Sequence, residues 1–311
     1  MVLLGIIPKS GQFSPLLQNS LPDMQIALPS PFDFRETLRF LNRSQDECLH
    51  YVSGQKVIKL LQEGNNRGLV SIHVSADQLI VTQIKGDSLS SDFIRHYLNQ
   101  WFDLDRDLSS FYAIEAENIK SLIKAFPGVR VVAIPDLFEA ICWSIIGQQI
   151  NLAFAYKIKR RLIEHFDESI EYEGHKHYLF PDPEHILTLS EKELRDMQFS
   201  RQKIQYIQIA AEKLASGEVS RKTLEPLTYE SRLGLLTSIK GIGEWSANYI
   251  LMKTLRQQEA IPYGDAGLNQ GISRILGLDR KPTRSETEDF FKKAPGWGAY
   301  LTFYVWRSLG E

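Results

Sequence analysis

The hydrophobic pattern of the sequence changes near residue 105, and this change limits the folds open to the chain. Before this point, short runs rich in β-branched and aromatic residues alternate with turn signals. These runs are CLHYV (48–52), KVIKLLQ (56–62), LVSIHV (69–74) and QLIVTQI (78–84). After this point, helical patterns of roughly 8 to 16 residues follow one another with short polar joints. The sequence therefore predicts two parts of different structural class.

The first part, residues 1–104, is predicted to be an α+β domain built on an antiparallel sheet. The turn signals between its strands are Ser53-Gly54, Asn65-Asn66 and Ala76-Asp77. Helices are expected over 30–44 and 91–102, where apolar residues fall on one face. Residues up to about Leu21 show no clear period, and we expect a loose arm or an edge strand there.

The second part, residues 105–311, is predicted to be an all-α domain. The expected helices cover 115–126, 136–146, 151–166, 183–189, 191–197, 201–216, 228–238, 244–257, 265–276, 285–293 and 297–309. Their lengths and short connections are typical of a compact helical domain. No repeat of fixed period interrupts the pattern.

The composition is that of a soluble globular protein, with 43% hydrophobic and 24% charged residues and a net charge of −2. The apolar start lacks a basic leader and a cleavage signal, so we expect a cytoplasmic protein without a membrane span. The two cysteines, Cys48 and Cys142, stand far apart and exclude a four-cysteine zinc or iron–sulfur site.

Residues 201–311 hold 16 Lys and Arg against 12 Asp and Glu. With so small a positive excess, any contact with nucleic acid must also use backbone amides.

The stretch IKGIGEWSANYI (239–250) places two glycines one residue apart at the start of a predicted helix. Gly241 and Gly243 permit positive φ and close backbone approach. Free amides at a helix N-terminus also favour an anion, so the turn can bind a phosphate. By itself the motif is more typical of a plain tight turn between helices with no ligand.

Asp265 lies in IPYGDAGLNQGISRILG (261–277), directly before a predicted helix. Aspartate is a favoured N-cap, which stabilises a helix by about 1 kcal/mol. A carboxylate near a bound sugar–phosphate can instead activate water or stabilise an oxocarbenium-like sugar. The sequence leaves both interpretations open.

Trp245 and Tyr249 are spaced i, i+4 and therefore share one face of the helix after the glycines. Trp297 lies in APGWGAY (294–300), near the C-terminus. Aromatic residues at helical spacing are often part of a core. Trp245 follows the turn so closely that it is also well placed to stack against a base extruded from a duplex.

In chain order, IKGIGEWSANY, PYGDAGL and PGWGAY resemble the helix-hairpin-helix (HhH-GPD) DNA glycosylase superfamily. Within this superfamily, the three motifs are most similar to those of the alkylpurine branch, which is represented by 3-methyladenine DNA glycosylase II. Two further segments, 138–162 and 200–218, resemble core helices of the family. The resemblance covers about residues 105–311 and is weaker before them, where PFDFRETLRFL (31–41) resembles the branch's opening helix.

The resemblance implies a role for individual residues. Asp265 matches the catalytic aspartate, and Gln149 matches the wedge that fills the gap left by a flipped base. The hairpin that binds backbone phosphate, with a monovalent cation held by nearby carbonyls, corresponds to Lys240, Gly241, Ile242 and Gly243. The base-pocket aromatics correspond to Trp245, Tyr249, Trp297 and Phe40.

Three positions depart from relatives in the family. The wedge position, apolar in some relatives, is Gln149, and Ala266 replaces an aromatic residue found after the aspartate in others. Members that also cut the strand carry a nucleophilic lysine where this chain has Trp245. The resemblance therefore implies a monofunctional base excision repair enzyme that uses water, needs no cofactor and leaves an abasic site.

The expected substrate is double-stranded DNA containing damaged purines of the 3-methyladenine and 7-methylguanine type. We expect a monomer without an obligate protein partner that associates with the nucleoid through DNA. Two alternatives remain open: a non-enzymatic module that only binds the DNA backbone, and a bifunctional oxidised-purine glycosylase/lyase.

Overall fold

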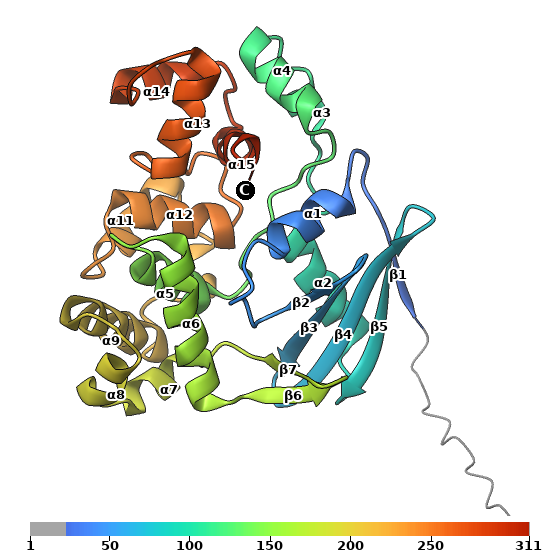
Figure 1. Cartoon of the computed structure of the whole chain (residues 1–311), viewed down its shortest axis with the longest axis vertical. Coiled ribbons are helices and arrows are strands. Elements are labelled where there is room, and N and C mark those ends of the chain that lie inside the picture. The colour runs from blue at the N-terminus through green and yellow to red at the C-terminus, as the bar shows by residue number, and fades with distance from the viewer. Residues whose placement is uncertain (1–22, 311) are drawn as a thin grey trace, which may run out of the picture.

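The computed structural model describes residues 23–310, and its N-terminal part is a five-stranded antiparallel sheet of order β1-β5-β4-β3-β2 (Figure 1). The strands are β1 Met24–Ala27, β2 Tyr51–Ser53, β3 Lys56–Glu63, β4 Asn66–Ser75 and β5 Gln78–Gly86. The predicted antiparallel meander is confirmed as β2 to β5. Strand β1 was not predicted and pairs with β5 at one edge. The prediction of an arm or edge strand up to Leu21 lies outside the described residues.

Tight turns set the register of the sheet. In the β4–β5 hairpin, Ser75 pairs with Gln78. The two residues between them, Ala76 and Asp77, have φ angles of 47° and 59°. Two left-handed residues in a two-residue loop match the right-handed twist of the flanking strands. The Ala76-Asp77 turn signal is therefore confirmed.

Helices α1 (Phe34–Leu41) and α2 (Ser91–Phe102) lie between the sheet and the helical part of the molecule (Figure 1). Helix α2 matches its predicted bounds. Helix α1 begins later than predicted because the Asp33 side chain accepts a hydrogen bond from Arg35 N, 2.9 Å away, and caps the helix there. Both helices bury apolar side chains in a core that extends through both parts of the chain.

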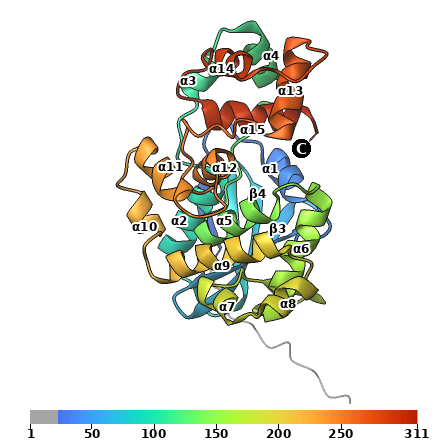
Figure 2. The ribbon, with the colours of Figure 1, turned by 90° about the vertical axis from the view of Figure 1, so that its left-hand side faces the viewer.

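The C-terminal part consists mainly of helices, seen from two sides in Figures 1 and 2. They are α3 Ser109–Tyr112, α4 Glu117–Ala125, α5 Leu137–Ile146, α6 Leu152–Phe166, α7 Pro183–Thr188, α8 Glu191–Asp196, α9 Arg201–Ala215, α10 Arg221–Leu224, α11 Tyr229–Thr237, α12 Glu244–Thr254, α13 Ala266–Leu276, α14 Arg284–Phe291 and α15 Gly298–Ser308. Every helix predicted here is present, and α3 and α10 are additional. In the part of the chain that the structure describes, no helix is long and apolar enough to cross a membrane.

The prediction of a helical second part is confirmed, and this part also contains a small β-hairpin that was not predicted. Its strands are β6 (Ser169–Tyr172) and β7 (His175–Tyr178), each four residues long. The intervening Glu173 and Gly174 have φ angles of 48° and 75°, again suited to a two-residue loop. The hairpin lies beside the sheet, where Lys85 Nζ donates a hydrogen bond to Glu171 O at 2.6 Å. Strands of this length are too short to give a clear alternating pattern in the sequence.

A fully buried carboxylate, Asp103, joins the two parts of the chain. It lies at the C-terminal end of α2 and accepts hydrogen bonds from Tyr300 OH of α15 at 2.6 Å and Arg256 Nη1 at 2.6 Å. Arg106 Nε adds a third at 2.8 Å. Since a buried charge is costly unless paired, these partners are needed to keep Asp103 inside.

An extended segment, residues 129–135, runs between α2 and the C-terminal end of α12. Ala133 N donates a hydrogen bond to Trp101 O of α2 at 2.8 Å. Ile134 N donates to Lys253 O of α12 at 2.7 Å. The segment therefore fixes the end of α12 against the N-terminal part. The predicted domain boundary at residue 104 remains a prediction, because one hydrophobic cluster continues across it.

Candidate active site and nucleic-acid interface

The two glycines form the turn between α11 and α12, as the sequence predicts. Gly241 has a φ angle of 94°, in the region that favours glycine. A Cβ at this position would lie 2.2 Å from the ring of Tyr206 on α9, so space as well as conformation requires glycine. Ile242 is buried under the turn, with 4% of its surface exposed. Packing on α9 thereby fixes where α12 begins.

The start of α12 presents its amides to solvent. Gly243 occupies the N-cap position and has no side chain with which to cap them. A Cβ on Gly243 would meet nothing within 4 Å, and both Gly243 and Lys240 are exposed. Uncapped amides and the helix dipole favour an anion. The surface of this hairpin is therefore suited to a phosphate group.

Gln148 and Gln149 connect the hairpin with the end of α5. Gln148 Nε2 donates hydrogen bonds to Gly241 O at 2.9 Å and to Ser246 Oγ at 3.3 Å. Gln149 is exposed and adopts a left-handed conformation with a φ angle of 56°. It lines a groove at the hairpin of about 440 Å³ and also the main cavity described next. The predicted wedge residue, Gln149, thus lies between the groove at the hairpin and the main cavity.

A cavity of about 670 Å³ lies beside the hairpin. Its volume is typical of a small-molecule site. The predicted site residues that line it are Phe40, Gln149, Trp245, Tyr249 and Asp265. They come from α1, the loop after α5, α12 and the N-cap of α13, so the fold brings together residues that are far apart in the sequence. Ala266, at the start of α13, also lines the cavity.

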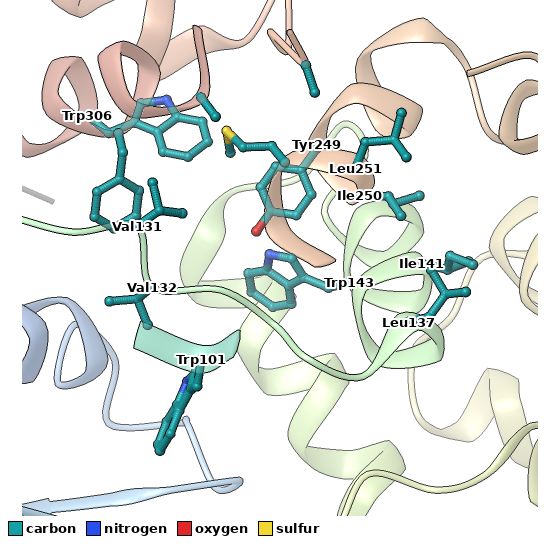
Figure 3. Packing of buried hydrophobic residues seen from close by; sticks show 14 of the residues in the cluster. Trp101, Val131, Val132, Leu137, Ile141, Trp143, Tyr249, Ile250, Leu251 and Trp306 are labelled. Carbon is teal, nitrogen blue, oxygen red and sulfur yellow. The ribbon is translucent and has the colours of Figure 1, made fainter. Parts of the chain in front are cut away.

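Helix α12 supplies one wall of the cavity. The rings of Trp245 and Tyr249 are stacked, with centroids 5.8 Å apart and an interplanar angle of 23°. Tyr249 lies between Trp306 and Trp143 in Figure 3, with its hydroxyl directed toward Trp143. Burial raises the pKa of Tyr249, so its hydroxyl stays neutral. The wall is thus a set of aromatic faces suited to a flat, apolar ligand.

Asp265 combines the two roles that the sequence left open. Its Oδ1 caps α13 by accepting a hydrogen bond from Leu268 N at 2.7 Å. The same oxygen accepts a second hydrogen bond from Trp306 Nε1 at 2.9 Å. Within residues 23–310, no group hydrogen-bonds the other oxygen, Oδ2. The cap therefore orients the carboxylate, and one oxygen remains for a ligand in the cavity.

Trp306, on α15, was not predicted as a site residue, and it takes the place assigned to Trp297. Trp306 lines the cavity, whereas Trp297 does not. Trp297 packs outside it, with ring centroids 5.3 Å from Phe111 and 5.5 Å from Tyr300. The assignment of Trp297 to the pocket is corrected on this geometry.

The close approach of α13 and α15 explains why Trp306 reaches Asp265. A Cβ on Gly271 of α13 would lie 2.3 Å from Val305 Cγ1 of α15, so these helices meet only with glycine at this position. Trp306 is 41 residues from Asp265 in the sequence. No local pattern spans that distance, and the contact depends on tertiary packing.

Two cationic side chains, Arg43 and Lys253, also line the cavity and were not predicted. Arg43 Nε donates a hydrogen bond to Tyr156 OH at 2.6 Å, and its Cζ lies 4.0 Å from the centroid of Phe40. Lys253 is only 1% exposed, and its Nζ lies 4.6 Å from the same centroid. Lys253 follows Trp245 and Tyr249 at a further helical spacing of four, a signal that the sequence did contain.

Comparison with protein families gives two matches that together span most of the chain. Residues 142–295 match the HhH-GPD superfamily of base excision DNA repair proteins. Residues 20–141 match the 8-oxoguanine DNA glycosylase N-terminal domain. A DNA-3-methyladenine glycosylase from Bacillus subtilis is 38% identical over 291 residues, which is 91% of this chain and 96% of that protein.

Solved structures share the same fold. A 3-methyladenine DNA glycosylase from Archaeoglobus fulgidus superposes with a TM-score of 0.79 at 22% identity, covering 91% of this chain and 97% of that one. An 8-oxoguanine glycosylase/lyase from Clostridium acetobutylicum, in complex with double-stranded DNA, has a TM-score of 0.66 at 16% identity. The match covers 86% of this chain and all of that one.

The hairpin geometry predicts that substituting Gly241 costs more stability than substituting Gly243. Gly241→Ala adds a Cβ against Tyr206 in a left-handed conformation, so we expect the free energy of unfolding to fall by more than about 1 kcal/mol. Gly243→Ala, the matched control, has open space and should cost clearly less. Urea unfolding of both variants measures the difference. Equal losses would show that the contact with Tyr206 does not fix the turn.

Proposed function

The chain belongs to the HhH-GPD superfamily of base excision DNA repair proteins, and we propose that it is a monofunctional DNA glycosylase that removes alkylated purines. The observation that carries the proposal is the cavity in which Asp265 meets the aromatic side chains of α12 and α15. The 38% identity to a DNA-3-methyladenine glycosylase over almost the whole chain supports the same substrate class.

We place the DNA backbone at the hairpin. The uncapped amides at the start of α12 point to solvent, and Gly243 leaves room for a phosphate to approach the backbone. Lys240 adds a positive charge beside it, and the hairpin carbonyls would hold a monovalent cation that supplies further positive charge. This arrangement suits a chain with a net charge of only −2, because backbone amides replace part of the cationic surface.

Base flipping follows from the relation between the hairpin and the cavity. With the phosphate at the hairpin, a rotated nucleotide enters the cavity next to it and stacks on Trp245 and Tyr249. Gln149, exposed between groove and cavity, is placed to fill the gap in the duplex. As an amide, it can also hydrogen-bond the base left without a partner.

The chemistry requires few groups because the substrate is already activated. Alkylation at N3 or N7 gives the purine a positive charge and makes it a good leaving group. Asp265, held by Leu268 N and Trp306 Nε1, presents a fixed negative charge to the sugar as the bond breaks. Water then adds to C1′ and yields an abasic site. We propose no cofactor for this reaction.

Two alternatives are less well supported. A bifunctional glycosylase/lyase needs a lysine nucleophile near C1′. The position that carries this lysine in such enzymes is Trp245 in this chain, and Lys253 Nζ donates a hydrogen bond to Val132 O. Borohydride trapping of a covalent DNA adduct would reveal a lyase. A module that only binds DNA has no need for a cavity that holds a carboxylate.

Duplex DNA with damaged purines is thus the proposed partner, and we propose a monomer that acts at the nucleoid in the cytoplasm.

Asp265→Asn tests the proposed mechanism. The amide keeps the size of the side chain but removes its charge, so we expect release of methylated purines to fall at least about 100-fold. Binding to duplex DNA should change little, because the hairpin is untouched. Chromatography of bases released from methylated duplex DNA measures the first, and a binding titration the second. If the variant releases bases at the wild-type rate, Asp265 is not catalytic.

Trp306→Phe tests how Asp265 is positioned. The variant keeps an aromatic ring but loses the N–H that holds Oδ1, and a hydrogen bond to a charged group contributes about 1.5–3 kcal/mol. We expect the single-turnover rate of base release to fall roughly 10- to 100-fold. Trp297→Phe is the control and should keep nearly the full rate, since Trp297 lies outside the cavity. A larger loss of rate in Trp297→Phe than in Trp306→Phe would show that Trp297, and not Trp306, supports base release.

A further inference from the structure

Lys253 is a buried lysine that lines the cavity. It is 1% exposed, and its Nζ donates a hydrogen bond to Val132 O. The same nitrogen lies 4.6 Å from the ring centroid of Phe40 and 5.2 Å from that of Phe303. The ion pairs found within residues 23–310 do not include Lys253. Buried lysines are usually paired, so an unpaired one in a cavity is a sign of a ligand.

The position of Lys253 on α12 places it at the end of the cavity away from the DNA backbone. Trp245, Tyr249 and Lys253 share one face of the helix and line the same cavity. At about 1.5 Å per residue, Lys253 lies roughly 12 Å along the axis from Trp245. The phosphate site is at the start of α12, next to Trp245. A flipped nucleotide that stacks its base on Trp245 and Tyr249 therefore directs the far edge of that base toward Lys253.

Among residues 23–310, Val132 O is the acceptor recorded for Lys253 Nζ, which leaves further N–H groups of this side chain. An ammonium group has three N–H donors and a neutral amine has two. Val132 O takes one of them, and the rings of Phe40 and Phe303 offer only their faces. Burial, followed by the charge of Arg43, lowers the Lys253 pKa well below its usual value. In either protonation state at least one N–H remains for a ligand.

Arg43 adds a guanidinium group to the same end of the cavity, where its Nε donates a hydrogen bond to Tyr156 OH at 2.6 Å. Its Cζ and the Lys253 Nζ both lie within 5 Å of the Phe40 centroid, at 4.0 Å and 4.6 Å. A guanidinium group has donors and no acceptor. This end of the cavity is thus suited to a base edge that accepts hydrogen bonds.

We propose that Lys253 determines specificity by donating a hydrogen bond to a carbonyl oxygen on the edge of the flipped base. The inference rests on the proposed glycosylase function. It assigns a preference for damaged purines that carry a 6-carbonyl, such as 7-methylguanine and hypoxanthine, over adenine-derived bases that carry an amino group. An amino group facing these donors leaves N–H groups on both sides unpaired, which is a strong basis for discrimination.

The test uses two bases from one substrate. Randomly methylated duplex DNA contains 7-methylguanine and 3-methyladenine, which are both cationic and differ at position 6. The ratio of their release rates, corrected for release without enzyme, is compared between wild type and Lys253→Met. We expect the ratio of 7-methylguanine to 3-methyladenine to fall at least about tenfold, because the variant loses the donor. Lys253→Gln retains an N–H₂ group and should recover part of the ratio.

Lys240→Met is the matched control, because Lys240 is exposed at the hairpin and would change the release of both bases in the same proportion. Thermal unfolding of every variant shows that it is folded. An unchanged ratio in folded Lys253→Met, or failure of Lys253→Gln to recover any of it, would overturn the role of Lys253 and leave the glycosylase intact. If wild type releases neither base, the proposed function itself fails.

Discussion

The site depends on the path of a single helix, α12, which runs from the protein surface into the core. Its first residue is fixed by Gly241, whose bare backbone packs on the Tyr206 ring. Its last turn is held by the 129–135 segment through the bond from Ile134 N to Lys253 O. Because both ends are fixed, the phosphate-binding amides and the aromatic wall of the cavity keep a constant relation. A shift of this helix would separate backbone binding from base recognition.

The helix after it shows how a structural device can also serve in catalysis. Asp265 is a helix cap that accepts a hydrogen bond from Leu268 N, as the N-cap residues of many helices do. The cap uses one carboxylate oxygen, and Trp306 holds the same oxygen from α15. The remaining oxygen is thereby oriented without further cost. The close packing of Gly271 against Val305 brings Trp306 into place, so a glycine remote from the cavity contributes to its geometry.

The parts of the site that local spacing predicted lie within α12 or next to it, whereas Phe40 and Gln149 were assigned only through the family resemblance. The turn at Gly241, the shared face of Trp245 and Tyr249, and the cap at Asp265 all follow from local spacing. Trp306 and Arg43 enter the cavity through packing between distant elements, which no local pattern records. Trp297 was misplaced because its motif fixes the start of α15 but not the face on which each aromatic side chain lies. The β6–β7 hairpin was missed because its strands have only four residues.

We propose that Asp265 stabilises a positively charged sugar in the cavity. This role is tested most directly by the affinity for duplex DNA carrying a cationic pyrrolidine in place of one sugar, compared with a neutral tetrahydrofuran. We expect the wild-type protein to bind the cationic duplex at least about tenfold more tightly, and Asp265→Asn to remove this preference. Equal affinity of the wild-type protein for both duplexes would show that Asp265 does not stabilise a charged sugar.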